Sequence, residues 1–269
     1  MSEEFLVSVC VITYNHEKYI GECLDSILNQ KTSFKFNVFV SDDCSQDNTL
    51  KILRNYESLN ENLSVVSRCG KGKSHFQNRP TGNMNFIENL QIANGTYIAI
   101  CDGDDVWTTS DKLQNQVDVL SQRNDLALIC SSKNVLCDGK LYSAKLLLPD
   151  IEFSSSLLCF FNPIPSSSAL FRRSDFRPPP KWFFYDLDVG DWPLWYQITR
   201  GKKILRLSKP LLNYRIHAAG TWGQKRKSDK ASSSLNVVTI LRNEYGDVLL
   251  KISRLLHLVR LTFYQFLGK

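Results

Sequence analysis

Two clusters of acidic residues offer the clearest chemistry in this chain of 269 residues: SDD at residues 41–43 and DGDD at residues 102–105. Each cluster follows a short apolar run of the kind that forms a buried strand. Adjacent carboxylates repel one another, so such a cluster is unfavourable unless a cation or hydrogen-bond donors compensate its charge. Carboxylate oxygens suit Mg²⁺ or Mn²⁺, which proteins hold through one or two carboxylates together with substrate phosphates. The clusters therefore predict a site for a divalent cation and phosphate, with an ordinary Asp-rich turn as the alternative.

The elements that would position these clusters alternate along the first 130 residues. Apolar runs predict strands, and a period of 3.6 residues predicts the helices between them. The expected strands are residues 6–13, 36–40, 63–67, 97–101 and 126–131, and the expected helices are residues 19–29, 48–56, 83–93 and 111–122. This alternation predicts an α/β domain with a mostly parallel sheet and helices on both faces. Because ligands of such sheets bind at the carboxyl ends of the strands, both acidic clusters are expected at one edge.

Polar and proline-rich segments interrupt this pattern elsewhere. We expect a loop at residues 70–81, a strand at 166–172, a helix at 191–199 and a basic, serine-rich linker at 225–234. The last segment, residues 235–269, has helical periodicity. Its end is predicted to be a basic amphipathic helix, with His257 on the polar face and the following residues on the apolar face: Ile252, Leu255, Leu256, Val259, Phe263, Phe266 and Leu267.

Charge is distributed unevenly along the chain. Residues 201–269 hold 14 Lys/Arg against 3 Asp/Glu, whereas residues 1–200 hold 19 Lys/Arg against 24 Asp/Glu. A basic tail of this kind favours an anionic partner: a membrane surface, a nucleic acid or a phosphorylated substrate. The acidic body would repel nucleic acid, and the tail has no aromatic residues interleaved along a basic groove, so we expect no nucleic-acid partner.

Composition excludes several classes of protein. With 43% hydrophobic residues the chain can bury a sizeable core, which excludes a disordered or fibrous protein. No apolar run approaches the roughly 20 residues that span a bilayer, and the acidic start predicts no secretory signal. The eight cysteines form no C-x-x-C pair, which favours reduced thiols in a cytoplasmic protein over a disulfide framework or a zinc site.

Seven segments together resemble the motifs of inverting family 2 glycosyltransferases with the GT-A fold. In order they are 9–15 (VCVITYN), 41–49 (SDDCSQDNT), 98–107 (IAICDGDDVW), 112–120 (KLQNQVDVL), 162–173 (NPIPSSSALFRR), 190–196 (GDWPLWY) and 214–221 (YRIHAAGT). The resemblance covers roughly residues 5–222, in the order of the family. It implies a GT-A domain at residues 1–222, which is a Rossmann-like, mostly parallel sheet flanked by helices. Residues 223–269 are then a basic linker and an amphipathic C-terminal helix.

The resemblance implies a nucleotide-diphosphate-sugar donor, with UDP-sugar as the expected class. Thr13, Tyr14 and Asn15 resemble the segment that wraps the base and ribose. Asp42 and Asp43 resemble the acidic pair that hydrogen-bonds uracil or ribose, and which of the two points inward stays open.

The resemblance also implies a divalent cation, Mg²⁺ or Mn²⁺. Asp102 and Asp104 resemble the D-x-D that contacts ribose and binds the metal on the diphosphate, and Gly103 would let the backbone approach the phosphates. Arg215 and His217 resemble a segment that closes over the diphosphate. His16, just past the first motif, either touches the donor or lies in an exposed loop, and the exposed loop is the preferred interpretation.

The resemblance places the catalytic base at Asp191, which would take the proton of the acceptor hydroxyl. A single attack from the opposite face inverts the anomeric configuration. Many relatives have Glu-Asp where this chain has Gly190-Asp191, so the support around the base is expected to differ. The next residue, Trp192, either lines the acceptor site or packs in the core.

The expected acceptor is a glycan or a polyprenyl-linked glycan in the synthesis of a bacterial-type surface polysaccharide. We therefore expect a cytoplasmic protein at the inner face of the cell membrane, with the C-terminal helix in contact with the membrane surface. Packing of that helix on the domain and formation of a homodimer are the alternatives.

Two other functions compete with glycosyl transfer. A sugar-1-phosphate nucleotidyltransferase would have a Gly-rich, basic loop after the first strand, and residues 13–16 (TYNH) do not form one. A non-catalytic module that binds nucleotide-sugars would not need Asp102, Asp104 and Asp191 together, and all three are present.

Overall fold

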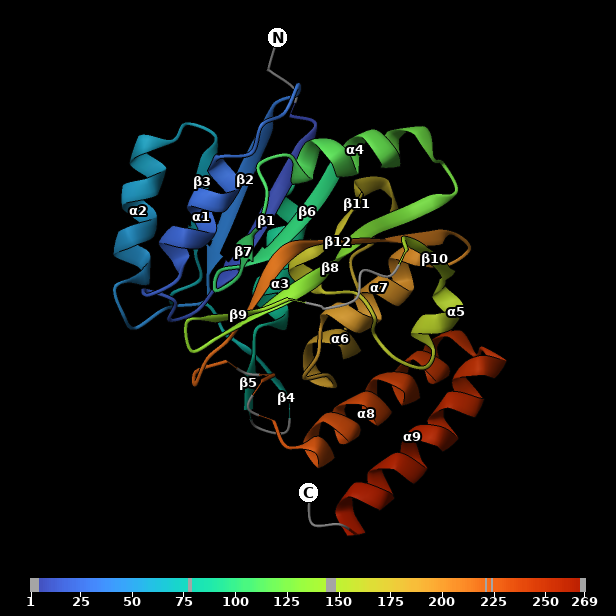
Figure 1. Cartoon of the computed structure of the whole chain (residues 1–269). Helices are drawn as coiled ribbons and strands as arrows, with labels where there is room; N and C mark the ends of the chain where they lie inside the picture. Colours follow the sequence, from blue (N-terminus) through green and yellow to red (C-terminus); the bar gives the residue numbers. More distant parts are fainter. Residues whose placement is uncertain (1–4, 77–78, 144–148, 221, 224, 267–269) are drawn as a thin grey trace.

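The computed structural model describes residues 5–76, 79–143, 149–220, 222–223 and 225–266, which are arranged around one large sheet (Figure 1). Parts of the expectations above lie outside the described residues. They are the acidic start at residues 1–4, residues 77–78 of the expected loop, Thr221 of the last motif, and residues 224 and 267–269 of the C-terminal part, which include Leu267.

Within the described ranges, ten strands form that sheet. Its order is β10-β12-β8-β11-β6-β1-β2-β3, with β7 paired to β12 and β9 paired to β8. The strands are β1 (Val7–Thr13), β2 (Phe36–Asp42), β3 (Leu63–Ser67), β6 (Tyr97–Asp102), β7 (Val106–Trp107), β8 (Leu126–Cys137), β9 (Lys140–Tyr142), β10 (Ile151–Ser154), β11 (Leu170–Arg172) and β12 (Lys203–Ile216).

The N-terminal half of the sheet is parallel, as the alternating pattern predicts. Strand β1 pairs with β2 on one side and with β6 on the other. In this register Thr13 lies opposite Asp42, and Ile12 lies opposite Asp102. Both acidic clusters therefore meet at the carboxyl edge of the sheet, on either side of the end of β1.

The C-terminal half brings a distant segment to the same edge. Strand β11 is antiparallel between β6 and β8, and β12 runs parallel to β8. The end of β12 also pairs with the short strand β7, where Leu212 lies opposite Trp107. Because β7 follows the DGDD cluster directly, this pairing sets residues 102–105 beside the segment that contains Arg215 and His217.

Helices cover both faces of the sheet (Figure 1). On one face α1 (Ile20–Leu28), α2 (Thr49–Leu59) and α4 (Lys112–Gln122) bury Ile20, Leu53 and Leu113 against side chains of β1 and β6. On the other face α3 (Asn83–Ile92) and α7 (Asp191–Thr199) bury Phe86 and Trp195. The short helix α5 (Ser155–Leu158) contacts α7, and the short helix α6 (Trp182–Tyr185) contacts α3. Five free cysteines are buried in these layers: Cys10, Cys23, Cys101, Cys130 and Cys159.

Three local expectations were wrong. The expected loop at 70–81 contains a hairpin of β4 (Ser74–Phe76) and β5 (Arg79–Thr81), held by the hydroxyls of Ser74 and Thr81 at 2.7 Å. The expected strand at 166–172 begins as a 3₁₀ turn, and only Leu170–Arg172 pairs in the sheet. The expected linker at 225–234 is the first part of helix α8 (Lys227–Tyr245).

Tertiary contacts explain why the serine-rich segment is helical. Val237, Val238 and Leu241 of α8 are fully buried in the core that α7 shares. Ser233 donates its hydroxyl to Asp188 at 2.6 Å, so a residue with weak helix propensity is stabilised by a partner outside the helix. Burial of one face thus outweighs the local composition that suggested a linker.

The chain reverses after α8 at Gly246, whose φ of 70° favours glycine, and continues as α9 (Val248–Phe266). Helices α8 and α9 lie side by side, with α9 on the outside of the molecule (Figure 1). His257 of α9 is buried, and its Nε2 lies 2.8 Å from the carbonyl oxygen of Phe160. His257, expected on the polar face of this helix, therefore packs on the protein, whereas Lys251 and Arg260 of the same face are exposed. No helix of the described residues is both long and apolar enough to cross a membrane.

Lys112, in the fourth motif, is fully buried. Its Nζ donates to Gln116 Oε1 at 2.8 Å and lies 4.0 Å from the centre of the Trp107 ring. Burial lowers the pKa of Lys112 from 10.5 to about 7. Between these two values the unfolded chain binds more protons than the folded one, so the contribution of Lys112 to stability rises with pH.

We expect this contribution to be absent in Lys112→Met, which keeps the length of the side chain. Unfolding free energies of both proteins, measured by urea titration at several pH values from 7 to 10, are the test. The advantage of the wild type over the variant should grow by about 1.4 kcal/mol per pH unit. A difference that stays constant with pH would contradict a buried, neutral amine.

Candidate active site

The loops after β1 and β2 are joined by Ser45. The backbone N–H of Asn15, a residue with φ of 55°, donates to Ser45 Oγ at 2.8 Å. Asp42 is fully buried and accepts bonds from both the hydroxyl and the backbone N–H of Ser45. Asn15 and Asp42 are therefore linked through Ser45 beside the carboxyl edge of the sheet, and Tyr14 is exposed.

Asp43 faces two cations that the sequence did not single out as its partners. Its carboxylate lies 3.1 Å from Lys73 Nζ and 3.7 Å from Arg68 Nε. Burial raises the pKa of Asp43, against the opposing effect of these two cations. Lys73 also lies 3.9 Å from the ring centre of Tyr14. Arg68 follows the end of β3 directly, so its place at the carboxyl edge was the signal that could have identified it.

Within the DGDD turn, Asp105 and Gly103 have structural partners. Asp105 is buried and accepts bonds from Ser167 Oγ at 2.6 Å and from the backbone N–H of Arg215 at 2.8 Å. A side chain at Gly103 would place its Cβ 2.9 Å from Oγ1 of Thr13, so close packing against β1 requires glycine here. The approach of Gly103 to phosphates stays a prediction.

Asp104 lies among two histidines. Its Oδ2 is 2.9 Å from His217 Nε2 and 3.9 Å from His16 Nε2, and the three potential ligand atoms lie within 4.8 Å of one another. Burial works against the charge of Asp104, but the bond to His217 and the positive charge of both histidines outweigh it and lower its pKa. His16 is largely buried rather than in an exposed loop, and burial lowers its pKa.

This cluster is chemically suited to a divalent cation, because carboxylate oxygen is a ligand of Mg²⁺ and Mn²⁺ and imidazole nitrogen is a ligand of first-row transition metals. The residues present therefore fit the cation that the family resemblance implies. Asp102 is not part of the cluster that the structure forms around Asp104. A role for Asp102 as a metal ligand stays a prediction.

Asp191 is the first residue of α7 and is held at both carboxylate oxygens. Oδ1 accepts the backbone N–H of Trp192 at 2.8 Å, and Oδ2 accepts Nδ2 of Asn162 at 2.9 Å. Burial raises the pKa of Asp191. Burial also raises the pKa of Asp102 to about 7, with the nearby charges of Asp104 and Asp191 acting in the same direction. The carboxylate of Asp191 therefore shares an electrostatic environment with the D-x-D cluster.

The glycine before Asp191 fits against a neighbouring helix. A Cβ at Gly190 would lie 2.6 Å from Oδ1 of Asn83. Asn83 in turn donates to the carbonyl oxygens of Phe183 and Leu187 at 3.2 and 2.9 Å. A side chain at Gly190, such as the glutamate that the family resemblance implies, would therefore displace the Asn83 amide from these bonds, and Asp191 is supported by the amide of Asn162 instead.

Trp192 packs in the core. Its side chain is buried, and its indole N–H donates to the carbonyl oxygen of Leu158 at 2.7 Å. Its ring centre lies 6.1 Å from that of His257 in α9. This packing favours the core alternative over the expected role of Trp192 in the acceptor site.

The last two expected site residues both contact the DGDD turn. Arg215 donates from Nε to the carbonyl oxygen of Asp104 at 2.7 Å, and its Nη2 pairs with Glu22 at 2.6 Å.

Lys133 was not among the expected site residues. Its Nζ lies 3.8 Å from the ring centre of Tyr214 on the adjoining strand. Burial lowers the pKa of Lys133, against the charges of Asp105 and Asp191. Lys133 was missed because β8 extends six residues beyond its expected end.

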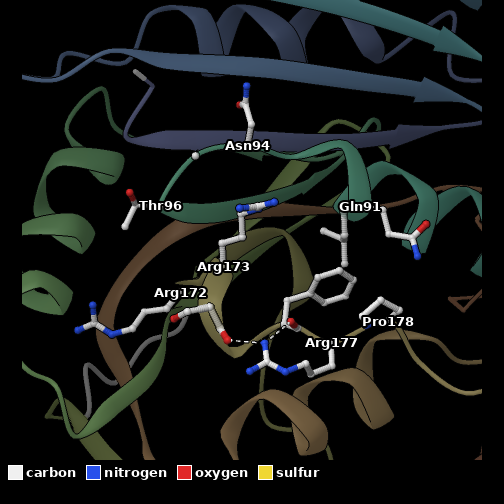
Figure 2. Close-up of a pocket in the computed structure, with 11 residues that line it drawn as sticks. Gln91, Asn94, Thr96, Arg172, Arg173, Arg177 and Pro178 are labelled. Carbon is white, nitrogen blue, oxygen red and sulfur yellow. Dashed lines mark hydrogen bonds between the residues drawn. The ribbon is translucent and has the colours of Figure 1, made fainter. Parts of the chain in front are cut away.

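A pocket of about 560 Å³ lies elsewhere, at the opposite edge of the sheet where β6 begins (Figure 2). Arg172, Arg173 and Arg177 line it together with Asn94 and Thr96. The guanidinium of Arg172 bonds to the carbonyl oxygens of Leu120 and Arg123, and that of Arg177 bonds to Ser174 and Phe176. The acidic clusters are at the other end of the strands, so this pocket is separate from the candidate active site.

Comparison with known proteins identifies the family. The sequence profile described as "Glycosyl transferase family 2" matches residues 8–177, which is more than half of the chain. The chain belongs to glycosyl transferase family 2. The matched range of this family member includes both acidic clusters and ends before Asp191, Arg215 and His217.

Among relatives of this family member, the putative teichuronic acid biosynthesis glycosyltransferase TuaG of Bacillus subtilis is 33% identical over 120 residues, which are 44% of this chain and 43% of TuaG. Uncharacterized mycobacterial proteins are 29% identical over 226 residues, or 80% of this chain. The chain spans 60% of the length of these mycobacterial relatives.

Solved structures confirm the GT-A fold expected from the motifs. TarS of Staphylococcus aureus in complex with UDP-GlcNAc has a TM-score of 0.66 at 20% identity, over 88% of this chain and 66% of that chain. The mannosyltransferase PcManGT of Pyrobaculum calidifontis in complex with GDP-Man and Mn²⁺ has a TM-score of 0.64 at 19% identity, over 96% of this chain and 72% of that chain.

Proposed function

We propose that this family 2 enzyme transfers a hexose from a UDP-sugar to a hydroxyl of a glycan or polyprenyl-linked glycan, with inversion. The observation that supports the proposal most directly is the contact of Asp104 with His217 beside the carboxyl edge of the sheet, with the charge of Asp191 near enough to Asp102 to raise its pKa. TuaG supports a place in polysaccharide synthesis, and the TarS complex supports a UDP-sugar donor. Such acceptors place the enzyme at the cytoplasmic face of the membrane.

Asp191 is the proposed catalytic base. The hydrogen bonds from Asn162 and the N–H of Trp192 fix the orientation of its carboxylate, and burial raises its pKa towards that of a useful base. As the acceptor oxygen bonds to the anomeric carbon, its proton passes to Asp191. The bond between that carbon and the diphosphate oxygen breaks, and the nucleoside diphosphate leaves. One displacement of this kind inverts the anomeric centre.

Asp104 and His217, with His16 beside them, are the residues that would hold Mn²⁺ or Mg²⁺. A bound divalent cation would supply positive charge to stabilise the departing diphosphate. Asp102, Gly103 and Arg215 are proposed to contribute to the same donor side.

Thr13, Tyr14, Asn15, Asp42 and Asp43 are proposed to bind the nucleoside. The hydrogen bonds through Ser45 hold Asn15 and Asp42 in place, while Tyr14 remains exposed for contact with a base. Arg68 and Lys73 hold Asp43 in place. Because these side chains are already held in place before the donor binds, less conformational entropy is lost on binding.

A screen of thermal stability tests the donor class directly. Uridine, guanosine and thymidine diphosphate sugars are added with Mn²⁺, with Mg²⁺ or with a chelator, and the unfolding midpoint is measured. A UDP-sugar at about 100 times its Kd should stabilise the folded state by about 2.7 kcal/mol, and only when the metal is present.

Release of UDP in the presence of a glycan acceptor would then distinguish a glycosyltransferase from a non-catalytic module that binds nucleotide-sugars. Formation of a nucleotide-sugar and pyrophosphate from a nucleoside triphosphate and a sugar-1-phosphate, without transfer of sugar to a hydroxyl acceptor, would support the nucleotidyltransferase alternative. Binding of the donor without transfer to any hydroxyl acceptor would support the non-catalytic alternative.

A further inference from the structure

Helix α9 packs on the protein through a narrow inward face. Leu250 and Ser253 are fully buried, and His257 is anchored to the carbonyl oxygen of Phe160. These three residues follow one another at intervals of three and four, so they form one stripe along the helix. The stripe leaves the opposite side of α9 facing outward.

That outward side is apolar. Its five large apolar residues are between 47% and 69% exposed: Ile252, Leu255, Leu256, Val259 and Phe263. Their spacing places them on one continuous stripe of the helix. Single exposed apolar residues are ordinary, but a contiguous stripe of this length marks an interaction surface.

Basic residues border the apolar stripe on both sides. At 100° per residue, Lys251 and Arg260 lie about 90° to either side of its centre. The helix contains no acidic residue. Lys227 adds an exposed positive charge at the start of the neighbouring α8, where Arg226 is paired with Asp229. An apolar stripe between cationic borders matches the layers of an anionic bilayer surface, where acyl chains lie beneath phosphate groups.

We propose that the outward face of α9 docks this protein on an anionic phospholipid surface, with the helix lying in the plane of the membrane. The charge pattern favours lipid over a second copy of the chain. A two-fold pairing of identical stripes would bring the basic borders of both copies, Lys251 and Arg260, close together. The helix has no acidic residue that could compensate this positive charge.

Docking goes beyond the proposed reaction and does not depend on it. One consequence does rest on the proposed function. The inward face of α9 contacts Trp192, the neighbour of the proposed base Asp191. Docking through α9 would therefore hold the acceptor side of the active site close to the membrane, where a polyprenyl-linked glycan lies.

The test measures co-flotation of the full chain with vesicles and uses no nucleotide-sugar. Vesicles of phosphatidylcholine mixed with phosphatidylglycerol should bind the protein, while phosphatidylcholine alone should bind it far less. Added salt should weaken binding because it screens the charges. Leu255→Gln with Val259→Gln should lower the affinity at least tenfold. Lys251→Gln with Arg260→Gln should lower it roughly 30-fold on anionic vesicles.

Leu59→Gln with Leu141→Gln is the matched control. Both leucines are exposed, at 74% and 53%, but lie on α2 and β9. This variant should bind vesicles like the wild type, and all three variants should keep the wild-type unfolding midpoint because the altered side chains are exposed.

Three outcomes would overturn the proposal. The first is no binding to anionic vesicles, and the second is binding that the α9 substitutions leave unchanged. The third is a dimer in sedimentation that Leu255→Gln with Val259→Gln dissociates while vesicles are not bound, since a second copy would then cover the face.

Discussion

Asp191→Asn is expected to reduce sugar transfer by about 10²–10⁴-fold while leaving the affinity for the nucleotide-sugar unchanged. Asparagine has nearly the same shape and can still accept the N–H of Trp192, but it cannot take a proton from the acceptor. The loss should therefore fall on kcat rather than on donor binding. Steady-state kinetics with a saturating acceptor and calorimetry with the donor are the two measurements.

Asp186→Asn is the matched control for this variant. Asp186 precedes α7 by five residues and is exposed, so the same chemical change there should leave kcat and donor affinity as in the wild type. If Asp191→Asn transfers sugar at a rate near that of the wild type, Asp191 is not the base. If donor affinity falls together with kcat, its role includes donor binding.

Asp104→Asn is expected to weaken binding of the nucleotide-sugar in the presence of Mn²⁺ by at least tenfold. Loss of residues that only orient a metal ligand typically weakens metal binding by about 10–100-fold, so loss of a ligand itself should do no less. With a chelator present, the variant and the wild type should bind the donor equally. Calorimetry with Mn²⁺ and with chelator measures both values.

His217→Gln should show the same dependence on metal, because His217 Nε2 lies 2.9 Å from the carboxylate of Asp104. Asp118→Asn, an exposed carboxylate on α4, is the control and should change neither value. Equal donor affinity of Asp104→Asn and the wild type with Mn²⁺ present would remove Asp104 from the metal site.

Much of the fold was predictable because buried strands and amphipathic helices carry their own periodicity. The apolar run of β1 is buried on both faces, and α1 buries the stripe of Ile20, Leu24 and Ile27 that its spacing predicts. The linker that became α8 was not predictable in this way. Its serines have weak helix propensity, and they are helical because Val237 and Leu241 are buried on the core.

The contacts within the candidate site were less accessible to sequence reasoning. The position at the end of a strand identified Asp102 and Asp104, and the family resemblance named His217, but neither predicted that His16 and His217 lie around Asp104. His217 is 113 residues away in the chain, and its place depends on the pairing of β12 with β7. His16 comes near because β1 ends beside β6. Arg68 meets Asp43 because β3 pairs with β2.

By itself, the sequence determined that carboxylates follow neighbouring parallel strands, since strand order along the chain and the rule that ligands bind at carboxyl ends do not depend on side-chain packing. It also determined that the last helix has an apolar and a basic side. Only the tertiary structure decided which side of α9 faces the protein. Periodicity describes two faces, but the hydrogen bond of His257 to Phe160 and the packing of Leu250 select the inward one. The apolar stripe is therefore left outside, because contacts between distant segments, rather than local pattern, set the orientation of a surface helix.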